Sequence, residues 1–333
     1  MPLLDVGYRG WEGDRTPRWT RSLVLASTGI HLVWQGTWLK RILMFAVIPA
    51  LIAGGFVAVM EQTFDQGLVT SALLRMSQSH EGRENAERMG IDLERLTQDP
   101  EVARHYLWSY ILFMLFRYPQ AFGMIVVVGL VAPRLISYDL RSRGYLLYLS
   151  RPLTAIEYIF GKALVVFFLL FMMAAVPALA IYVVGLVLSP GSTAFFHTWD
   201  IPLRVFVATL VLMIPTTAIA LAFSSVTQES RFAGFAWFAL WVLGSVIYRV
   251  LWLASEAEVQ MGPGRARMRM DKMQEWSRWK LFSPYETLGY MQQQIFGLLP
   301  SDQWDWSPWL LAVVVSVLGY GVAYWRVSRV LKV

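Results

Sequence analysis

Residues 156–188 read IEYIFGKALVVFFLLFMMAAVPALAIYVVGLVL, and from Ala163 onward they contain no charged residue. A helix needs about 20 consecutive apolar residues to cross the hydrocarbon core of a bilayer. Pro177 does not argue against a span, because neighbouring helices can satisfy the carbonyl group that a proline leaves free. The stretch is therefore predicted to be a transmembrane helix.

The rest of the chain has the same character. Of its 333 residues 56% are hydrophobic and only 16% are charged, with a mean hydropathy of +0.47, whereas a soluble domain carries about 25% charged residues. Five further apolar runs approach the length of a span. The sequence thus predicts an all-α, polytopic membrane protein with six transmembrane helices. The predicted spans are residues 42–60, 120–137, 156–188, 201–223, 232–254 and 308–325.

The positions of Lys and Arg predict the orientation, because these residues collect in short cytoplasmic loops. The insert between spans two and three, the C-terminal tail and the segment before span one are all basic. We therefore expect a multi-pass protein of the cell inner membrane with both termini in the cytoplasm. The same bias explains the net charge of +6, so no nucleic-acid partner is predicted.

Two long loops, residues 61–119 and 255–307, then lie outside the cytoplasm. Both are long enough to fold. They are interpreted as a cap over a lateral opening, which would suit a lipid-linked or amphipathic substrate, or as a spacer with a belt of tryptophans. Alternatively, the cap binds an extracytoplasmic accessory protein. Within the first loop, residues 106–116 are apolar but too short to span, and they are predicted to form an interfacial or re-entrant helix.

The N-terminal unit, residues 1–41, is predicted to contain an amphipathic helix at residues 18–38 that lies on the cytoplasmic membrane surface. Its apolar residues recur at gaps of four and three, which places them on one helical face. These residues are Trp19, Leu23, Ala26, Ile30 and Val33. Residues 42–333 form the transmembrane domain.

The insert between spans two and three, residues 137–162, reads SYDLRSRGYLLYLSRPLTAIEYIFGK. Pro152 disfavours a helical conformation at Arg151. Thr154 and Glu157 then match the capping box that starts a helix. The insert is predicted to contain a short helix at residues 140–149 across the cytoplasmic mouth, followed by a new helix from Thr154. The alternative is a basic loop without a further role.

The order of residues in this insert resembles the cytoplasmic motif of ABC-2 type transporter permeases, most closely the NosY-like branch. The resemblance rests on Asp139-Leu-Arg, the run YLLYLSRPLT, Tyr158 and Gly161-Lys162, with a weaker match at residues 222–234. It implies that residues 140–152 are a coupling helix that docks on a separate ATPase subunit. The amphipathic helix at residues 18–38 would flank it as an interface helix.

The resemblance assigns the ATPase contacts to seven residues, namely Arg141, Arg143, Tyr145, Tyr148, Ser150, Arg151 and Pro152. Arginine suits this task because it pairs with carboxylates through two parallel hydrogen bonds, and tyrosine is a common anchor in interfaces. The alternative for the two tyrosines is contact with lipid headgroups.

The resemblance also implies the partners. These are two cytoplasmic ABC ATPase subunits per complex, a second permease copy or a sister permease, and membrane lipid. The sequence has no Gly-x-x-x-x-Gly-Lys-Ser/Thr motif, so ATP and magnesium are expected in the partner ATPase and no cofactor in this chain. The four histidines show no metal-binding spacing, and no catalytic residues are predicted.

The chain is therefore predicted not to be an enzyme but a permease subunit that couples ATP hydrolysis to export of an unknown substrate. The alternative is a membrane scaffold or assembly factor that acts through its outer loops without transport.

Pro215, Thr216 and Thr217 form the most polar site at mid-membrane depth and are the candidate pathway residues. Threonines at such a position also commonly bond to their own helix or to a neighbour. The interiors of the predicted spans contain no Asp or Glu, which argues against proton-driven transport. Arg204 and Arg249 lie near predicted span ends and are expected to extend to the outer interface.

Overall fold

The computed structural model describes Pro17, residues 20–80, Arg83, and residues 93–144, 153–189, 193–261, 279–299 and 304–331. These residues form helices and connecting turns, and no strand occurs among them. Six helices are long and apolar enough to cross a membrane. The predicted all-α fold with six spans is confirmed.

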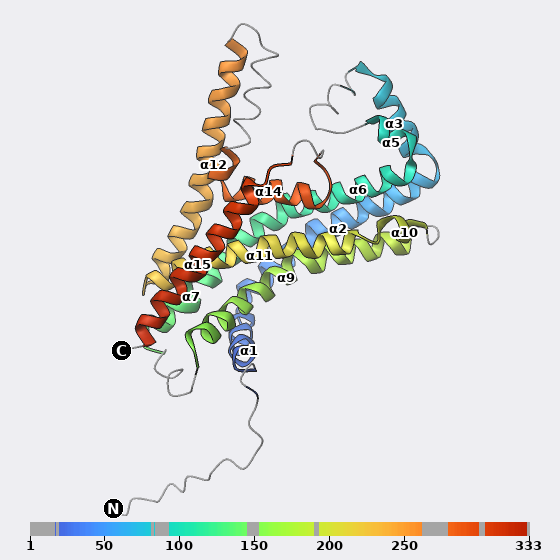
Figure 1. Ribbon diagram of the computed structural model, residues 1–333. Helices are drawn as coiled ribbons and strands as arrows, with labels where there is room; N and C mark the ends of the chain where they lie inside the picture. Colours follow the sequence, from blue (N-terminus) through green and yellow to red (C-terminus); the bar gives the residue numbers. More distant parts are fainter. Residues whose placement is uncertain are drawn as a thin grey trace, which may run out of the picture.

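Figure 1 shows the six long helices. They are α2 (Thr37–Asp65), the continuous helix Pro100–Arg141, α9 (Ala155–Leu188), α11 (Ile201–Val226), α12 (Ser230–Met261) and α15 (Ser307–Leu331). The spans Pro100–Arg141, Ala155–Leu188 and Ala194–Val226 are 56–61% buried along their most apolar windows, whereas the other three are only 12–22% buried. The helices α7, α9 and α11 therefore form the core, and the exposed sides of α2, α12 and α15 are apolar.

The helix Pro100–Arg141 consists of α6 (Pro100–Leu115), the π-helical turn η1 (Phe116–Gln120) and α7 (Ala121–Arg141). A proline inside an α-helix clashes with the preceding turn and lacks an N–H donor. Here Pro119 lies in the wider π-helical turn, and the helix continues through it. The prediction of a separate interfacial or re-entrant helix at residues 106–116 is wrong, because this segment is part of the second span.

The first helix, α1 (Thr20–Trp34), is separated from α2 by Gln35 and Gly36. It crosses α9 closely at two glycines. A methyl group at Gly29 would come within 2.6 Å of Val165 Cγ2, and one at Gly161 within 2.8 Å of Leu25 Cδ2. The helix is distinct from the first span, as predicted.

The face that α1 buries includes three residues of the predicted stripe, because Ala26 is buried and Ile30 and Val33 pack against the core. Ser22 and Ala26 are buried, and Leu25 packs on the core, but Leu23 is 46% exposed. The difference arises because α1 packs on α9 instead of lying alone on a membrane surface.

Short helices complete the fold. They are α3 (Leu68–Gln78), α5 (Leu93–Gln98), α10 (Thr193–Thr198), the 3₁₀ turn η2 (Lys280–Phe282) and α14 (Pro284–Ile295). In Figure 1, α3, α5 and α10 lie at the end of the bundle opposite to α1, where α2 ends and α6 begins. We call the end at which α7 ends and α9 begins the basal end. The helix α14 packs against α11, α12 and α15.

Candidate functional site

At the basal end, three side chains tie α7 to α9. The Nζ atom of Lys162 lies 2.7 Å from Oδ2 of Asp139, and the hydroxyl group of Tyr158 donates a 2.7 Å hydrogen bond to the same oxygen. The side chains of Lys162 and Asp139 are only 10% and 14% exposed. We call these three residues the Asp139 clamp. It fixes the two helix ends that flank residues 142–153.

The start of α9 determines the geometry of the clamp. Thr154 accepts a hydrogen bond from the backbone N–H of Glu157, and the carboxylate of Glu157 accepts one from the backbone N–H of Thr154. The predicted capping box is therefore confirmed. Since residues four apart lie on the same face of a helix, Tyr158 and Lys162 both point from α9 towards Asp139.

The structure places only part of the predicted coupling segment. Leu140 and Arg141 belong to the last turn of α7, and residues 142–144 form a turn with Arg143 in the left-handed region at a φ of 53°. The predicted helix therefore does not begin at Leu140, because α7 continues past Ser137. Five candidate contact residues lie outside the described residues, namely Tyr145, Tyr148, Ser150, Arg151 and Pro152.

Arg141 connects the segment to a second connection at the basal end. Its Nη1 atom lies 3.1 Å from Oε2 of Glu229, which belongs to the turn between α11 and α12. Both side chains are exposed, at 64% and 45%. Exposed ion pairs contribute little to stability, so this contact leaves both groups available for a partner.

A serine from α11 inserts into the hydrogen-bond ladder of α7. The hydroxyl group of Ser224 donates to the carbonyl of Pro133 at 3.0 Å and accepts from the backbone N–H groups of Ile136 and Ser137. Nearby, Arg326 of α15 donates to the carbonyl of Val226 at the C-terminus of α11. Polar contacts thus join α7, α9, α11, α12 and α15 at the basal end.

The clamp is the feature that the sequence analysis missed. Asp139, Tyr158 and Lys162 were all quoted within the family-like motif, but none was given a role. The available signal was an acid at the end of one helix and a lysine two turns into the next.

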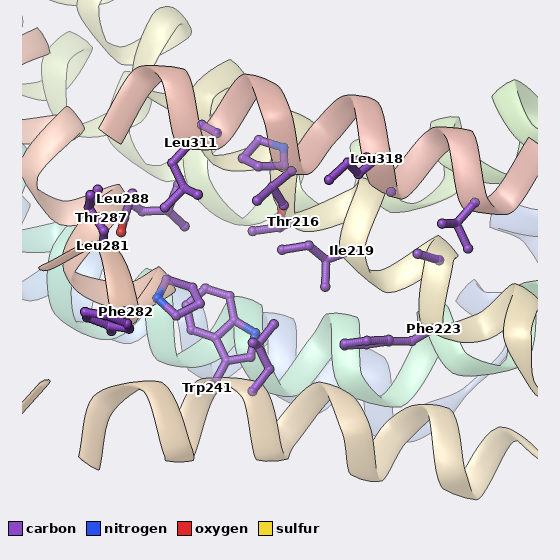
Figure 2. A pocket seen from close by; sticks show the side chains of 18 residues that line it. Thr216, Ile219, Phe223, Trp241, Leu281, Phe282, Thr287, Leu288, Leu311 and Leu318 are labelled. Carbon is purple, nitrogen blue, oxygen red and sulfur yellow. The ribbon is translucent and has the colours of Figure 1, made fainter. Parts of the chain in front are cut away.

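The candidate pathway residues lie beside an apolar cavity of about 440 Å³ between α11, α12 and α15 (Figure 2). Pro215 and Thr216 line it. The hydroxyl group of Thr216 donates to the backbone carbonyls of Leu212 and Met213, within its own helix. The hydroxyl group of Thr217 is buried and makes no hydrogen bond to any described residue. The threonines therefore do not form a polar channel together, and their pathway role remains a prediction.

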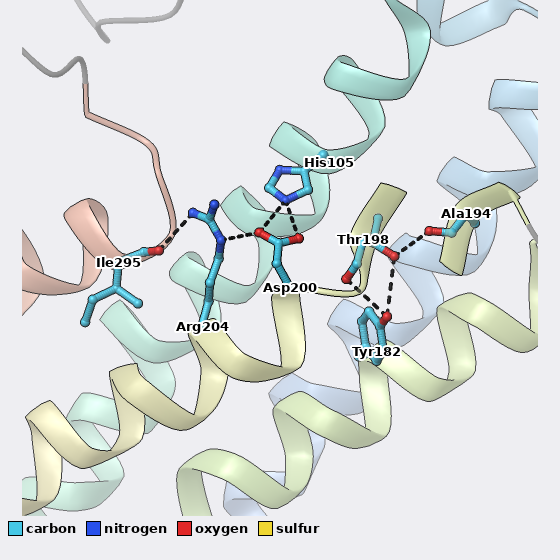
Figure 3. A network of polar contacts seen from close by, with 7 residues as sticks. All are labelled: His105, Tyr182, Ala194, Thr198, Asp200, Arg204 and Ile295. Atoms are coloured by element: carbon cyan, nitrogen blue, oxygen red, sulfur yellow. Dashed lines mark hydrogen bonds and ion pairs between the residues drawn. The ribbon is translucent and has the colours of Figure 1, made fainter. Parts of the chain in front are cut away.

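Far from the basal end, a polar network joins α6, α11 and α14 (Figure 3). His105 Nε2 lies 2.9 Å from Asp200 Oδ1, and Arg204 Nε lies 2.6 Å from Asp200 Oδ2. Arg204 also donates to the carbonyl of Ile295 at the end of α14. Arg204 lies in the first turn of α11 and is 31% exposed within this network, and its position at the outer interface stays a prediction. Arg249 is exposed.

A second correction concerns acidic residues inside the spans. The helix α2 extends past residue 60 and includes Glu61, which is completely buried. Its carboxylate accepts a 2.7 Å hydrogen bond from the indole of Trp108 and lies 3.4 Å from Arg104 Nε. A buried carboxylate with these partners joins α2 to α6. The statement that no acid occurs inside a span does not hold for the full length of α2.

Two cations hold α14 and its flanking residues in place. Arg117 pairs with Glu286 at 2.5 Å and stacks on the ring of Tyr285, 3.6 Å from its centre. Lys280 pairs with Asp305 at 3.0 Å. Burial lowers the pKa of Lys280, although Asp305 opposes this effect. Burial alone would raise the pKa of Asp305, but hydrogen bonds from Ser307 and Lys280 lower it. Burial and the ion pair thus act in opposite directions on the pKa of each group.

No group of three or more His, Asp or Glu side chains suited to a metal ion occurs among the residues that the structure describes. The basal end combines polar contacts between helices with the segment that resembles a coupling helix, and we take it as the candidate functional site.

A comparison with protein families bears on this site. The family model described as ABC-2 family transporter protein matches residues 37–330. The match includes nearly all of the six long helices and the whole Asp139 clamp, and it leaves α1 outside. No curated protein matches the chain.

Proposed function

The chain belongs to the ABC-2 transporter family, and we propose that it is the permease subunit through which a separate cytoplasmic ATPase drives export of a substrate across the inner membrane. In this arrangement the basal end faces the cytoplasm, together with both termini. ATP and magnesium bind to the ATPase. The NosY-like branch rests only on the order of residues in 139–162.

The observation that carries the proposal is the Asp139 clamp. Residues 142–153 connect α7 to α9, and they include most of the segment that resembles a coupling helix. Because the clamp ties the two helix ends together, a displacement of this segment moves α7 and α9 as one unit. The helix α9 packs on α1, α2 and α11, so the movement reaches most of the bundle.

The contacts around the clamp extend this route. Arg141 meets Glu229 between α11 and α12, and Ser224 joins α11 to α7. A push from the ATPase therefore acts on five spans through polar contacts at one end of the molecule. We propose that two ATPase subunits engage a dimer of this chain, or this chain and a sister permease. Family membership favours this function over a membrane scaffold.

The test is stimulation of ATP hydrolysis. The triple variant Arg141→Glu, Arg143→Glu and Arg151→Glu should lose most of the ATPase activity that the permease stimulates in membrane vesicles, because charge reversal repels the carboxylates expected in the docking groove. The control is Arg75→Glu, an exposed residue of α3 at the opposite end.

Two results would contradict the proposal. One is purification of the intact chain from native membranes without any nucleotide-binding subunit. The other is unchanged stimulation by the triple variant. The second result alone would show that these arginines are not the docking residues, and it would leave the family assignment unchanged.

A further inference from the structure

The cavity beside Thr216 is closed along its back and at one end. Its back wall is the contact between α11 and α15, where a methyl group at Gly319 would come within 2.8 Å of the backbone of Ala218. The start of α14 closes one end of the cavity. It packs on α12 so closely that a methyl group at Gly244 would meet Pro284 Cδ at 2.9 Å. Figure 2 shows α12 and α15 on opposite sides of the cavity, and no extensive packing joins them. The cavity opens between these two helices.

The lining of this cavity is apolar. Its side chains include Ile219, Phe223, Trp241 and Val315. The only hydroxyl groups in the lining belong to Thr216 and Thr287, and both are bonded to backbone carbonyls. One further polar group, the indole N–H of Trp241, has no hydrogen-bond partner among the described residues. A buried water needs about two to four polar partners, and a single free donor does not provide them. The cavity therefore suits hydrocarbon and neither water nor a charged headgroup.

The position and length of the cavity indicate which hydrocarbon. Its lining residues on α11, α12 and α15 all belong to membrane-spanning helices. On α15 the lining extends from Leu311 to Val322, which is about 16 Å at 1.5 Å per residue. The hydrocarbon core of a bilayer is about 30 Å thick, so the cavity is about as long as the acyl chains of one leaflet. Its open side faces the medium that contains those chains.

We propose that this cavity binds one acyl chain of a membrane phospholipid, which enters from the bilayer between α12 and α15 while its headgroup remains outside. The atoms that line this open apolar volume of about 440 Å³ lack packing partners on one side, which costs them dispersion contacts. The acyl chain restores these contacts. It fills the gap between α11, which carries Thr216, and the two peripheral helices α12 and α15. This site is independent of the proposed export function.

The experiment uses the full chain in lipid nanodiscs that contain a phospholipid with a diazirine near the end of one acyl chain. After illumination, adducts are mapped by mass spectrometry. We expect them on the cavity-lining residues of α11 and α15. The variant Val315→Trp fills the cavity and should reduce these adducts at least tenfold. The matched control is Val314→Trp, because Val314 is its neighbour, is 44% exposed and does not line the cavity.

If Val315→Trp does not fold, Ala312→Leu fills part of the cavity with a smaller change and should still reduce the adducts several-fold. The proposal is overturned if adducts are distributed evenly over the exposed faces of α2, α12 and α15, or if cavity filling leaves them unchanged. A second copy of the chain in the cavity would overturn it too. Since the chain has no cysteine, a disulfide between two copies of a Val315→Cys variant reports that outcome directly.

Discussion

Asp139 receives two charged or polar donors on one oxygen in a nearly buried site. Removing one partner of such a pair leaves an uncompensated charge, whereas removing both partners is often tolerated. The residues of the clamp were visible in the sequence, since they lie within the motif that resembles the family. Their contact was not predictable, because Asp139 and Lys162 are brought together only by the crossing of α7 and α9.

Substitutions in the clamp should separate its structural role from its coupling role. We expect Lys162→Met to lower stability by about 3–5 kcal/mol, the range for a broken buried pair, and to reduce ATPase stimulation. The double variant Asp139→Asn and Lys162→Met should recover most of the stability, because no buried charge is left unpaired. Thermal unfolding in detergent and ATPase assays in vesicles measure the two effects.

The exchanged pair Asp139→Lys and Lys162→Asp is the more demanding control. It keeps the ion pair but alters its position, so partial recovery of stimulation relative to Lys162→Met would support a role in transmission. If the double neutral variant retains full stimulation, the clamp is a stabilising pair and not part of the coupling route.

At the scale of elements, the sequence predicts what depends on local chemistry. The six spans, the capping box at Thr154 and the separate helix α1 follow from apolar length, capping residues and helical periodicity. The continuous helix through Pro119 does not, because a proline ordinarily indicates a helix end and the π-helical turn that accommodates it has no comparable sequence signature. The buried face of α1 agrees with the predicted stripe at Ala26, Ile30 and Val33, and it departs from the stripe at Leu23, which is 46% exposed.

The crossing of α1 and α9 offers a test based on glycines. Replacing an exposed helical glycine by alanine normally stabilises a helix by about 0.5–1 kcal/mol. We expect Gly55→Ala in α2 to be neutral or stabilising, because nothing lies within 4 Å of the new methyl group. In contrast, Gly29→Ala should loosen α1 from α9, because its methyl group meets Val165 at 2.6 Å.

Limited proteolysis measures this effect at the junction of α1 and α2, residues 35–36. Faster cleavage in Gly29→Ala than in Gly55→Ala is the expected result. Equal cleavage rates would show that the side chain of Val165 moves aside without cost and that the crossing does not depend on this glycine.

At the scale of the whole molecule, polar contacts collect at two ends of an apolar bundle. The basal end contains the Asp139 clamp and the contacts of Arg141 and Arg326. The opposite region contains the network of His105, Asp200 and Arg204 and the burial of Glu61. The sequence predicted charged groups at span ends, but it did not reveal that many of them pair across helices, because each pair joins residues far apart in the chain.

The positions of Arg141, Arg326 and Arg75 at the two ends of the bundle predict which residues face opposite sides of the membrane. Arg141 and Arg326 lie at the same end of the bundle through their contacts with the two sides of the α11–α12 turn, and α3 with Arg75 lies at the other. We expect cysteines at positions 143 and 75 to react from opposite faces of the membrane.

Because the chain has no native cysteine, single variants Arg143→Cys and Arg75→Cys give an unambiguous reading with a membrane-impermeant maleimide on intact cells and on inverted vesicles. Labelling of Arg143→Cys only in inverted vesicles and of Arg75→Cys only on cells would place the basal end in the cytoplasm, where an ATPase can reach it. The reverse pattern would invert the topology and make the coupling proposal untenable, since ATP is then on the wrong side of the membrane for residues 142–153.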